Sequence, residues 1–277
     1  MEIKTQINTI LGSNDYIEFL RGKSATFLLS LSTTNTLEIQ GITQAGIPGL
    51  IHLTPTLDSE FVCCGEVRCL ENLAETPKGV PTPALITRAV HLLKPFSNIE
   101  LLDLGMSKKP SLDYFKIHDF DLHPSQAINK GAQIDALSVF QKGVEFGKTY
   151  ECSDDYIILA ESVPSGTTTA YATALALGYD CAGKFSSSFK NAPTSIKEQT
   201  IKEALANIKD KEDLFERVGA VTDNMLVFNA GFILGNSHSK TKLILAGGTQ
   251  MAAVLLLANS IINYMGGKLE SDNLALC

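Results

Sequence analysis

The sequence predicts a three-layer α/β fold with a largely parallel, Rossmann-like sheet, joined to a small helical subdomain. Short β-rich runs alternate along the chain with longer segments of helical spacing. The runs at 156–160 and 242–246 are almost purely apolar, as expected for parallel strands covered by helices on both faces. The 277-residue chain is 44% hydrophobic and has few aromatic residues, so its core is expected to be aliphatic, which suits such layers.

Four segments are predicted strands and six are predicted helices. The strands are expected at 25–31, 99–104, 156–160 and 242–246. The helices are expected at 83–93, 125–146, 167–177, 195–208, 220–234 and 249–265. Thr82 before Pro83 is typical of a helix start, and Gly178 of a helix end. The segments 71–81 and 105–124 are expected to be irregular.

Two domains are predicted. Residues 1–24 are expected to form an N-terminal helical segment outside the sheet, as part of the small subdomain. Residues 25–277 are expected to form the α/β nucleotide-binding domain. The last residues, 273–277, follow a helix and a Gly-Gly break and resemble the first residues of another strand. This pattern predicts that the domain is truncated at its C-terminus.

Charge and composition argue against several classes of protein. The net charge is −7 and no Lys/Arg cluster stands out, so a nucleic-acid partner is not expected. The longest apolar run, 251–262, is well short of the roughly 20 residues that cross a bilayer, so no membrane partner is expected. The six cysteines match no zinc spacing and indicate buried, reduced thiols in a cytoplasmic protein.

The first candidate site is the junction at 161–169, where a strand ends in Glu161 and a Pro-Ser-Gly turn opens a helix. Gly166 lets the backbone approach a ligand closely, and the threonines at 167–169 lie at the positive end of a helix dipole. Glu161 is placed to bind ribose hydroxyls or to stabilise positive charge. An ordinary Ser/Thr helix cap is the alternative. Three consecutive threonines after a strand-terminal acid favour a ligand site.

The second candidate site is the junction at 243–253, where an apolar strand leads through Gly247 and Gly248 into a helix. The glycines allow close approach, and Thr249 and Gln250 supply side-chain donors. A tight strand-to-helix turn explains this segment equally well when it is considered alone. Neither junction fits the Walker phosphate loop or the dinucleotide glycine motif. Two such junctions in one chain favour a binding site more than either does alone.

The order of these elements resembles the nicotinate-nucleotide:dimethylbenzimidazole phosphoribosyltransferase family, especially its archaeal and cyanobacterial branch. The segments that carry the resemblance are 161–169, 174–183 and 246–253. The resemblance runs from about residue 54 onwards and is strongest after residue 155. Its motifs are specific in combination.

Within the resemblance, some positions match the bacterial pattern Glu-x-Gly-x-x-Asn-Thr-Thr and others depart from it. Glu161, Thr167 and Thr168 match, whereas Val163 and Gly166 replace the Gly and Asn. The family's phosphate-contacting lysine falls on Lys197, which on pattern alone is an ordinary solvated helix lysine. The family's Asp-Gly-Phe junction corresponds to 247–249, without the Asp. The two junction patterns and the resemblance together give Glu161 as catalytic, and Ser165, Gly166, Thr167, Thr168, Lys197, Gly247, Gly248, Thr249 and Gln250 as substrate-binding. The serines at 186–188 are read as plain loop.

The resemblance implies transfer of phosphoribose from nicotinate mononucleotide to a benzimidazole-like base. The product would be an α-ribazole phosphate for the lower ligand of cobamides. The resemblance implies no metal, no organic cofactor, and a homodimer. Nicotinate would leave C1′ as the acceptor nitrogen attacks the opposite face, with Glu161 stabilising the positive charge and the remote phosphate holding the sugar.

A base must also remove the acceptor's proton. In the family that base is a glutamate near the C-terminus, and no residue of this chain matches it. Two explanations stay open: the chain is a fragment of a catalytic parent, or it is a non-catalytic nucleotide or cobamide-precursor binding protein. A third alternative is a phosphoribosyl enzyme that uses adenine or a phenolic acceptor.

Overall fold

The computed structural model describes residues 15–43, 45–70, 82–185 and 194–277. The predicted linker at 71–81 and most of the predicted N-terminal segment lie outside these ranges.

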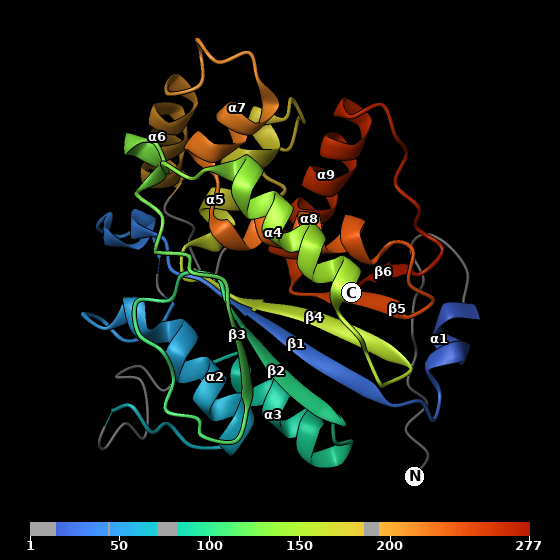
Figure 1. The fold of residues 1–277 in the computed structure, drawn as a ribbon. Coiled ribbons are helices and arrows are strands. Elements are labelled where there is room, and N and C mark those ends of the chain that lie inside the picture. The colour runs from blue at the N-terminus through green and yellow to red at the C-terminus, as the bar shows by residue number, and fades with distance from the viewer. Residues whose placement is uncertain (1–14, 44, 71–81, 186–193) are drawn as a thin grey trace.

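In the described residues, six strands form one sheet in the order β3-β2-β1-β4-β5-β6, and every neighbouring pair is parallel (Figure 1). The strands are β1 (Ala25–Leu31), β2 (Asn98–Asp103), β3 (Lys116–Asp119), β4 (Tyr156–Ser162), β5 (Lys242–Ala246) and β6 (Leu274–Leu276). The parallel sheet of the prediction is therefore confirmed. The strand expected at 273–277 is present as β6.

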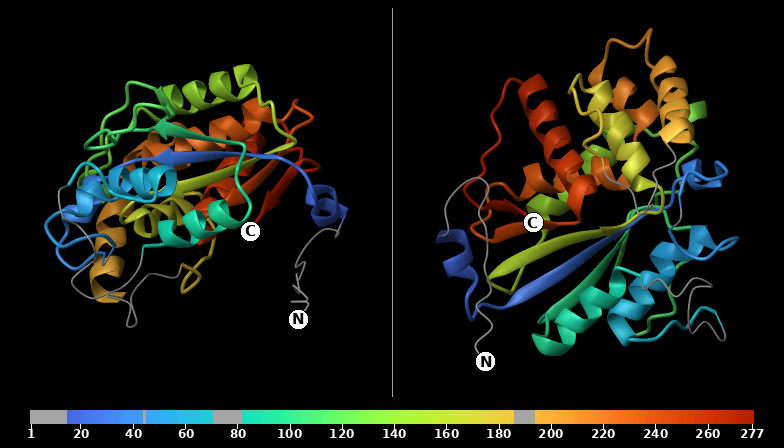
Figure 2. Two further views of the ribbon diagram at one scale, coloured as in Figure 1. Left: turned by 90° about the horizontal axis from the view of Figure 1, so that it is seen from below. Right: turned by 180° about the vertical axis from the view of Figure 1, so that it is seen from behind.

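Helices cover both faces of the sheet, as Figure 2 shows from two further sides. They are α1 (Asp15–Leu20), α2 (Thr54–Cys64), α3 (Ala84–Leu93), α4 (Ala136–Thr149), α5 (Gly166–Ala176), α6 (Thr194–Ala206), α7 (Leu214–Val221), α8 (Asn224–Asn236) and α9 (Gly248–Tyr264). Short 3₁₀ turns lie at Asn35–Glu38, Ile51–Leu53 and Ile128–Lys130. The three-layer α/β fold is confirmed.

The core lies in two layers because successive side chains of a strand point to opposite faces. Leu28, Leu159 and Leu245 belong to the larger cluster, beneath α4, α8 and α9. Leu29 and Leu101 belong to the second cluster, which α2 contributes to on the other face. This double cover explains why the central strands are apolar throughout.

The short helix α1 contacts the far edge of the sheet. The Tyr16 hydroxyl donates to the carbonyl oxygens of Leu243 and Asn273, at 3.1 and 3.2 Å. Burial raises the pKa of Tyr16 above its ordinary value, so the hydroxyl keeps its proton and these bonds. The division at residue 24 into a subdomain and an α/β domain stays a prediction.

The helix predicted at 125–146 is wrong at its start, since α4 begins only at Ala136. Gly131 and Gln133 have positive φ values of 82° and 56°, which an α-helix does not allow. The Asp135 side chain then accepts from the Ser138 amide at 3.0 Å and caps α4.

The helix predicted at 220–234 is also wrong, because two helices occupy this region. Thr222 and Asp223 have extended backbones and separate α7 from α8. The segment 105–124, expected to be irregular, contains the edge strand β3.

The six cysteines are free, but only Cys63 and Cys181 are buried and Cys277 is exposed, so the expectation that all six thiols are buried is wrong. Among the described helices, none combines the length and the apolar character that a bilayer span requires.

Candidate functional site

The candidate site lies at the carboxyl ends of β1 and β4, which are neighbours in the sheet. The chain leaves β1 towards β2 on one side and leaves β4 towards β5 on the other, so a crevice is expected between them. The register pairs Ser30 with Glu161 and Leu31 with Ser162. Glu161 is the next-to-last residue of β4 and is therefore at this edge. The helices α2 and α5 pack on opposite faces of the sheet (Figure 1).

The turn from β4 into α5 is held in a conformation that brings backbone close to the second junction. Ser165 has a φ of 68°, uncommon for a residue with a side chain, and it precedes the first residue of α5. A Cβ atom on Gly166 would lie 1.8 Å from Gln250 Oε1. A side chain there would displace the end of the Gln250 side chain, so the two predicted junctions pack directly against each other.

Glu161 joins the two junctions through hydrogen bonds. Its Oε1 accepts from Gln250 Nε2 at 3.0 Å, and its Oε2 accepts from the Val163 amide at 3.1 Å. Gly247, at a φ of 156°, packs against the Glu161 side chain, and a Cβ there would lie 3.1 Å from Glu161 Cγ. The structure thus brings together predicted residues that are about 85 positions apart.

Lys197 reaches the same region from α6. Its Nζ donates to Thr167 Oγ1 at 3.2 Å, in the first turn of α5. Burial lowers the pKa of the Lys197 ammonium, which has no carboxylate partner among the described side chains. A half-buried cation beside a helix N-terminus suits an anionic ligand.

Three polar atoms of the two junctions are buried without a partner in the described structure. They are Ser165 Oγ, Thr168 Oγ1 and Gln250 Oε1. Their residues are 6%, 1% and 9% exposed. Such groups normally find a hydrogen bond, and a bound ligand or water would supply one here.

The start of α9 is open on its outer side. Gly247 and Gly248 are exposed, and no atom lies within 4 Å of a Cβ built on Gly248. Thr249 is partly exposed in the same turn. The helix N-terminus is therefore accessible to a ligand.

Two further acids, which the sequence analysis did not single out, lie beside Glu161. Asp223 is fully buried; Thr169 Oγ1 donates to its Oδ2, and the Leu226 amide donates to its Oδ1 at 3.0 Å. Asp58 in α2 accepts from Thr82 Oγ1 and Ser162 Oγ, both at 2.7 Å. The helix-cap position of Asp223 before an apolar run was a signal that the sequence offered.

Burial is the largest cause of a raised Glu161 pKa, and repulsion by Asp223 and Asp58 adds to it. Hydrogen bonds from Val163 and Gln250 act in the opposite direction, and the resulting pKa is about 8. In the free protein at neutral pH the carboxyl is therefore mostly protonated. A cationic ligand nearby would favour its ionised form.

The predicted loop serines at 186–188 fall outside the described ranges.

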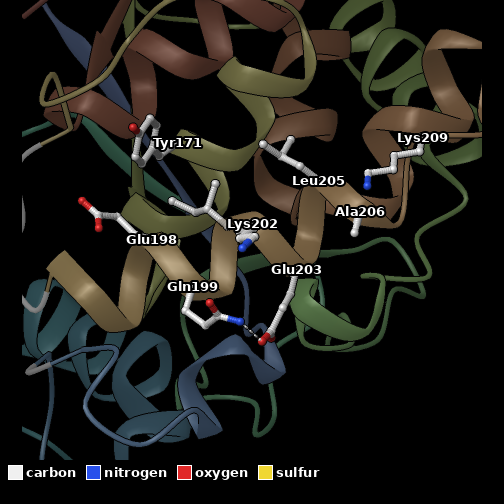
Figure 3. Close-up of a pocket in the computed structure, with 9 residues that line it drawn as sticks. Tyr171, Glu198, Gln199, Lys202, Glu203, Leu205, Ala206 and Lys209 are labelled. Atoms are coloured by element: carbon white, nitrogen blue, oxygen red, sulfur yellow. Dashed lines mark hydrogen bonds between the residues drawn. The ribbon is translucent and has the colours of Figure 1, made fainter.

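The described residues form one further feature near α6, away from the candidate site. A shallow pocket of about 540 Å³ runs along the outer face of α6, where Lys202 and Glu203 line it with Tyr171 of α5 (Figure 3). It includes none of the predicted site residues. In the described parts of the chain, no group of three or more His, Cys, Asp or Glu side chains is arranged to hold a metal ion.

Comparison with known sequences places the chain in a family. It is 35% identical over 244 residues to a UPF0284 protein of Saccharolobus solfataricus, covering 87% of this chain and 68% of that protein. The UPF0284 protein of Methanocaldococcus jannaschii is 34% identical over 257 residues, covering 91% of this chain and 71% of the relative. The chain belongs to the UPF0284 family. No family model matches it.

Solved structures share the fold of this UPF0284 protein. The nicotinate-nucleotide-dimethylbenzimidazole phosphoribosyltransferase of Thermus thermophilus superposes with a TM-score of 0.66 at 17% identity. The match covers 91% of this chain and 68% of the Thermus chain. A second structure, of CobT from the same organism, gives a TM-score of 0.65. The fold expected from the resemblance is thus confirmed, and the relatives are archaeal, as the resemblance implied.

Proposed function

We propose that this UPF0284 protein transfers phosphoribose from nicotinate mononucleotide to a benzimidazole-like base. The observation that carries the proposal is the convergence of Glu161, Lys197 and both strand-to-helix junctions at the switch point of the sheet. The fold shared with the Thermus phosphoribosyltransferase supports the same reaction class. The product is an α-ribazole phosphate.

In this proposal the nucleotide phosphate binds at the start of α5. The Lys197 ammonium is 3.2 Å from Thr167 Oγ1 at that helix end, so charge and helix dipole act on the same point. The unpartnered hydroxyls of Ser165 and Thr168 supply further donors. Gly247, Gly248 and Thr249 border the ribose and the nicotinate ring, while Gln250 holds Glu161.

Glu161 stabilises the positive charge that develops at C1′ as nicotinate leaves. The nucleotide's pyridinium nitrogen already carries a positive charge, and this charge ionises Glu161 on binding, since the raised pKa of the free carboxyl lies only about one unit above neutrality. The carboxylate is then formed at the point where the reaction needs it. No metal or organic cofactor takes part in this scheme, and a homodimer is the proposed assembly.

The first test is product analysis with purified protein. We expect nicotinate release and a phosphoribosylated base by mass spectrometry when 5,6-dimethylbenzimidazole and nicotinate mononucleotide are both present. Adenine and p-cresol in parallel reactions decide between acceptor classes. Glu161→Gln is expected to lower turnover about 100-fold and nucleotide affinity less than threefold, and normal turnover in that variant would refute the role of Glu161.

A non-catalytic nucleotide-binding protein is the second candidate. The burial of Glu161 beside Asp223 and Asp58 favours it, because this burial raises the pKa of the carboxyl to about 8 and leaves it mostly neutral in the free protein. It predicts thermal stabilisation by nicotinate mononucleotide with no nicotinate released for any of the acceptors. The same set of assays therefore separates the two functions.

A further inference from the structure

Asp58 is a third carboxyl group at the switch point, and the scheme above gives it no role. It comes from α2, on the face of the sheet opposite α5, and its Oδ2 accepts from Ser162 Oγ at 2.7 Å. Ser162 is the residue directly after Glu161 and ends β4. Asp58 and Glu161 thus both lie at the end of β4. A negative charge on Asp58 makes ionisation of Glu161 less favourable and so raises the pKa of Glu161.

The three acids differ in what their partners allow. Asp223 is fully buried and caps α8, so no ligand reaches it. Both oxygens of Glu161 accept from N–H groups, and of these only the Gln250 side chain can accept in return, after its amide flips. Both oxygens of Asp58 accept from hydroxyls, those of Thr82 and Ser162. A hydroxyl can rotate and accept, so Asp58 can take up a proton and keep both contacts.

Asp58 also remains reachable. The residue is half-buried, as is Glu161, whereas Asp223 is fully buried. The turn that follows Ser162 holds the hydroxyl of Ser165, which is 6% exposed and without a partner. In the proposed function this hydroxyl binds the nucleotide phosphate, so the bound nucleotide lies in the turn that directly follows Ser162, the partner of Asp58.

We propose that Asp58 binds the ring N–H of the acceptor base and accepts its proton, across the crevice from Glu161. This inference rests on the proposed function. In the step, the free ring nitrogen forms a bond to C1′, and the bond from C1′ to the nicotinate nitrogen breaks with its electron pair going to nicotinate. The proton on the other ring nitrogen passes to Asp58. The Ser162 hydroxyl turns to accept from the protonated carboxyl.

The test compares two acceptors, benzimidazole and 1-methylbenzimidazole, in wild type, Asp58→Asn and the control Asp113→Asn. The methylated ring has no N–H, so its transfer releases no proton. Asp58→Asn is expected to slow transfer to benzimidazole at least 100-fold while changing transfer to 1-methylbenzimidazole less than threefold. Its affinity for benzimidazole, measured by calorimetry with nucleotide present, is expected to fall at least tenfold. Asp113 is exposed, and its variant should match wild type.

Nucleotide affinity is measured separately, and it distinguishes the two proposals. If the wild type does not bind nicotinate mononucleotide, the proposed function itself fails. If the wild type binds it and Asp58→Asn loses nucleotide affinity in proportion to transfer, Asp58 is structural and the inference is wrong. Unchanged benzimidazole affinity and transfer in Asp58→Asn would overturn it equally.

Discussion

The raised pKa of Glu161 makes the stability of the free protein depend on pH. Burial, with repulsion from Asp223 and Asp58, raises this pKa from 4.5 to about 8, so the folded state holds a proton that the unfolded state releases above pH 4.5. Between these two values the folded chain binds more protons than the unfolded chain. Stability from this group is therefore present at low pH and is lost as the pH rises towards 8.

Glu161→Gln removes this titration and is expected to stabilise the free protein at pH 8 by about 4 kcal/mol. The new amide keeps the hydrogen bonds, since Gln250 Oε1 is unpartnered and a flipped Gln250 can accept from it. The advantage should shrink as the pH falls and vanish near pH 4.5. Urea denaturation of wild type and variant at pH 4.5, 6 and 8 measures it. An equal difference at all three values would mean that the Glu161 pKa is not raised.

At the level of single residues, sequence patterns could predict what is local. Glu161 follows an apolar strand and precedes a glycine turn, so its place at the sheet edge follows from the chain alone. Lys197 could be assigned only through the resemblance, because nothing near it in sequence tells it from a solvated lysine. Asp58 was not predicted, because its partners Thr82 and Ser162 are 24 and 104 residues away.

At the level of elements, α4 and α8 form the most extensive helix–helix contact in the described structure. Both carry glycines four positions apart, at 143 and 147 in α4 and at 231 and 235 in α8. A Cβ on Gly143 would lie 2.1 Å from the Phe228 carbonyl oxygen, and one on Gly231 would lie 2.2 Å from that of Phe140. Backbone meets backbone at this crossing, so neither helix can yield.

Gly143→Ala is therefore expected to destabilise the protein by about 3 kcal/mol, despite the better helix propensity of alanine. Gly178→Ala cannot serve as the control, because Gly178 has a φ of 89°, which would strain an alanine even without a clash. The control is Gln141→Ala in the same helix, at an exposed position, which should change stability by less than about 0.5 kcal/mol. Denaturant melts decide the point. A Gly143→Ala variant as stable as wild type would show that the two helices are not in contact at this crossing.

The helix cap at Asp223 links an element to the site. Asp223→Ala removes the cap of α8 and leaves Thr169 Oγ1 with only its bond to the Gly166 carbonyl. We expect a loss of about 2 kcal/mol from these two effects. Asp135→Ala removes the exposed cap of α4 and is expected to cost about 1 kcal/mol. Equal losses in thermal unfolding would indicate that the Thr169 contact adds nothing.

Element boundaries were predicted where apolar periodicity and turn residues agree, as in the strands Ala25–Leu31 and Lys242–Ala246. The predicted boundaries were wrong where an apolar pattern continues across residues with a non-helical backbone. The residues at 220–234 read as one helix because Val221 and Met225 fit a helical spacing, yet Asp223 caps a new helix between them. The edge strand β3 is partly exposed and short, so it lacks the apolar signal of the central strands.

At the scale of the whole molecule, the site depends on strand order, which no local pattern specifies. Residues from β4, α2, α6 and α9 meet only because β4 lies between β1 and β5. The prediction that both glycine junctions serve one site follows from parallel strands ending at one edge. The proximity of α2 follows only from the complete topology.

Because the proposed ligand joins these elements, its binding is expected to stabilise the entire chain. At a nucleotide concentration of 100 times Kd, linkage predicts a stabilisation of about 2.7 kcal/mol, or roughly 5 °C or more in thermal midpoint. Lys197→Ala removes a charge-assisted contact worth about 2 kcal/mol, which weakens binding about 30-fold. At the same concentration the variant should gain only about 0.9 kcal/mol.

Lys202→Ala is the matched control for this measurement. Lys202 lies on the same helix but faces the shallow pocket on its outer side (Figure 3), so this variant should gain as much stability from the nucleotide as wild type. Thermal scans with and without nicotinate mononucleotide compare the three proteins. If both lysine variants lose the shift equally, the effect is the general charge of α6. A loss confined to Lys197→Ala would place the phosphate at the start of α5, because Lys197 reaches Thr167 there and Lys202 does not.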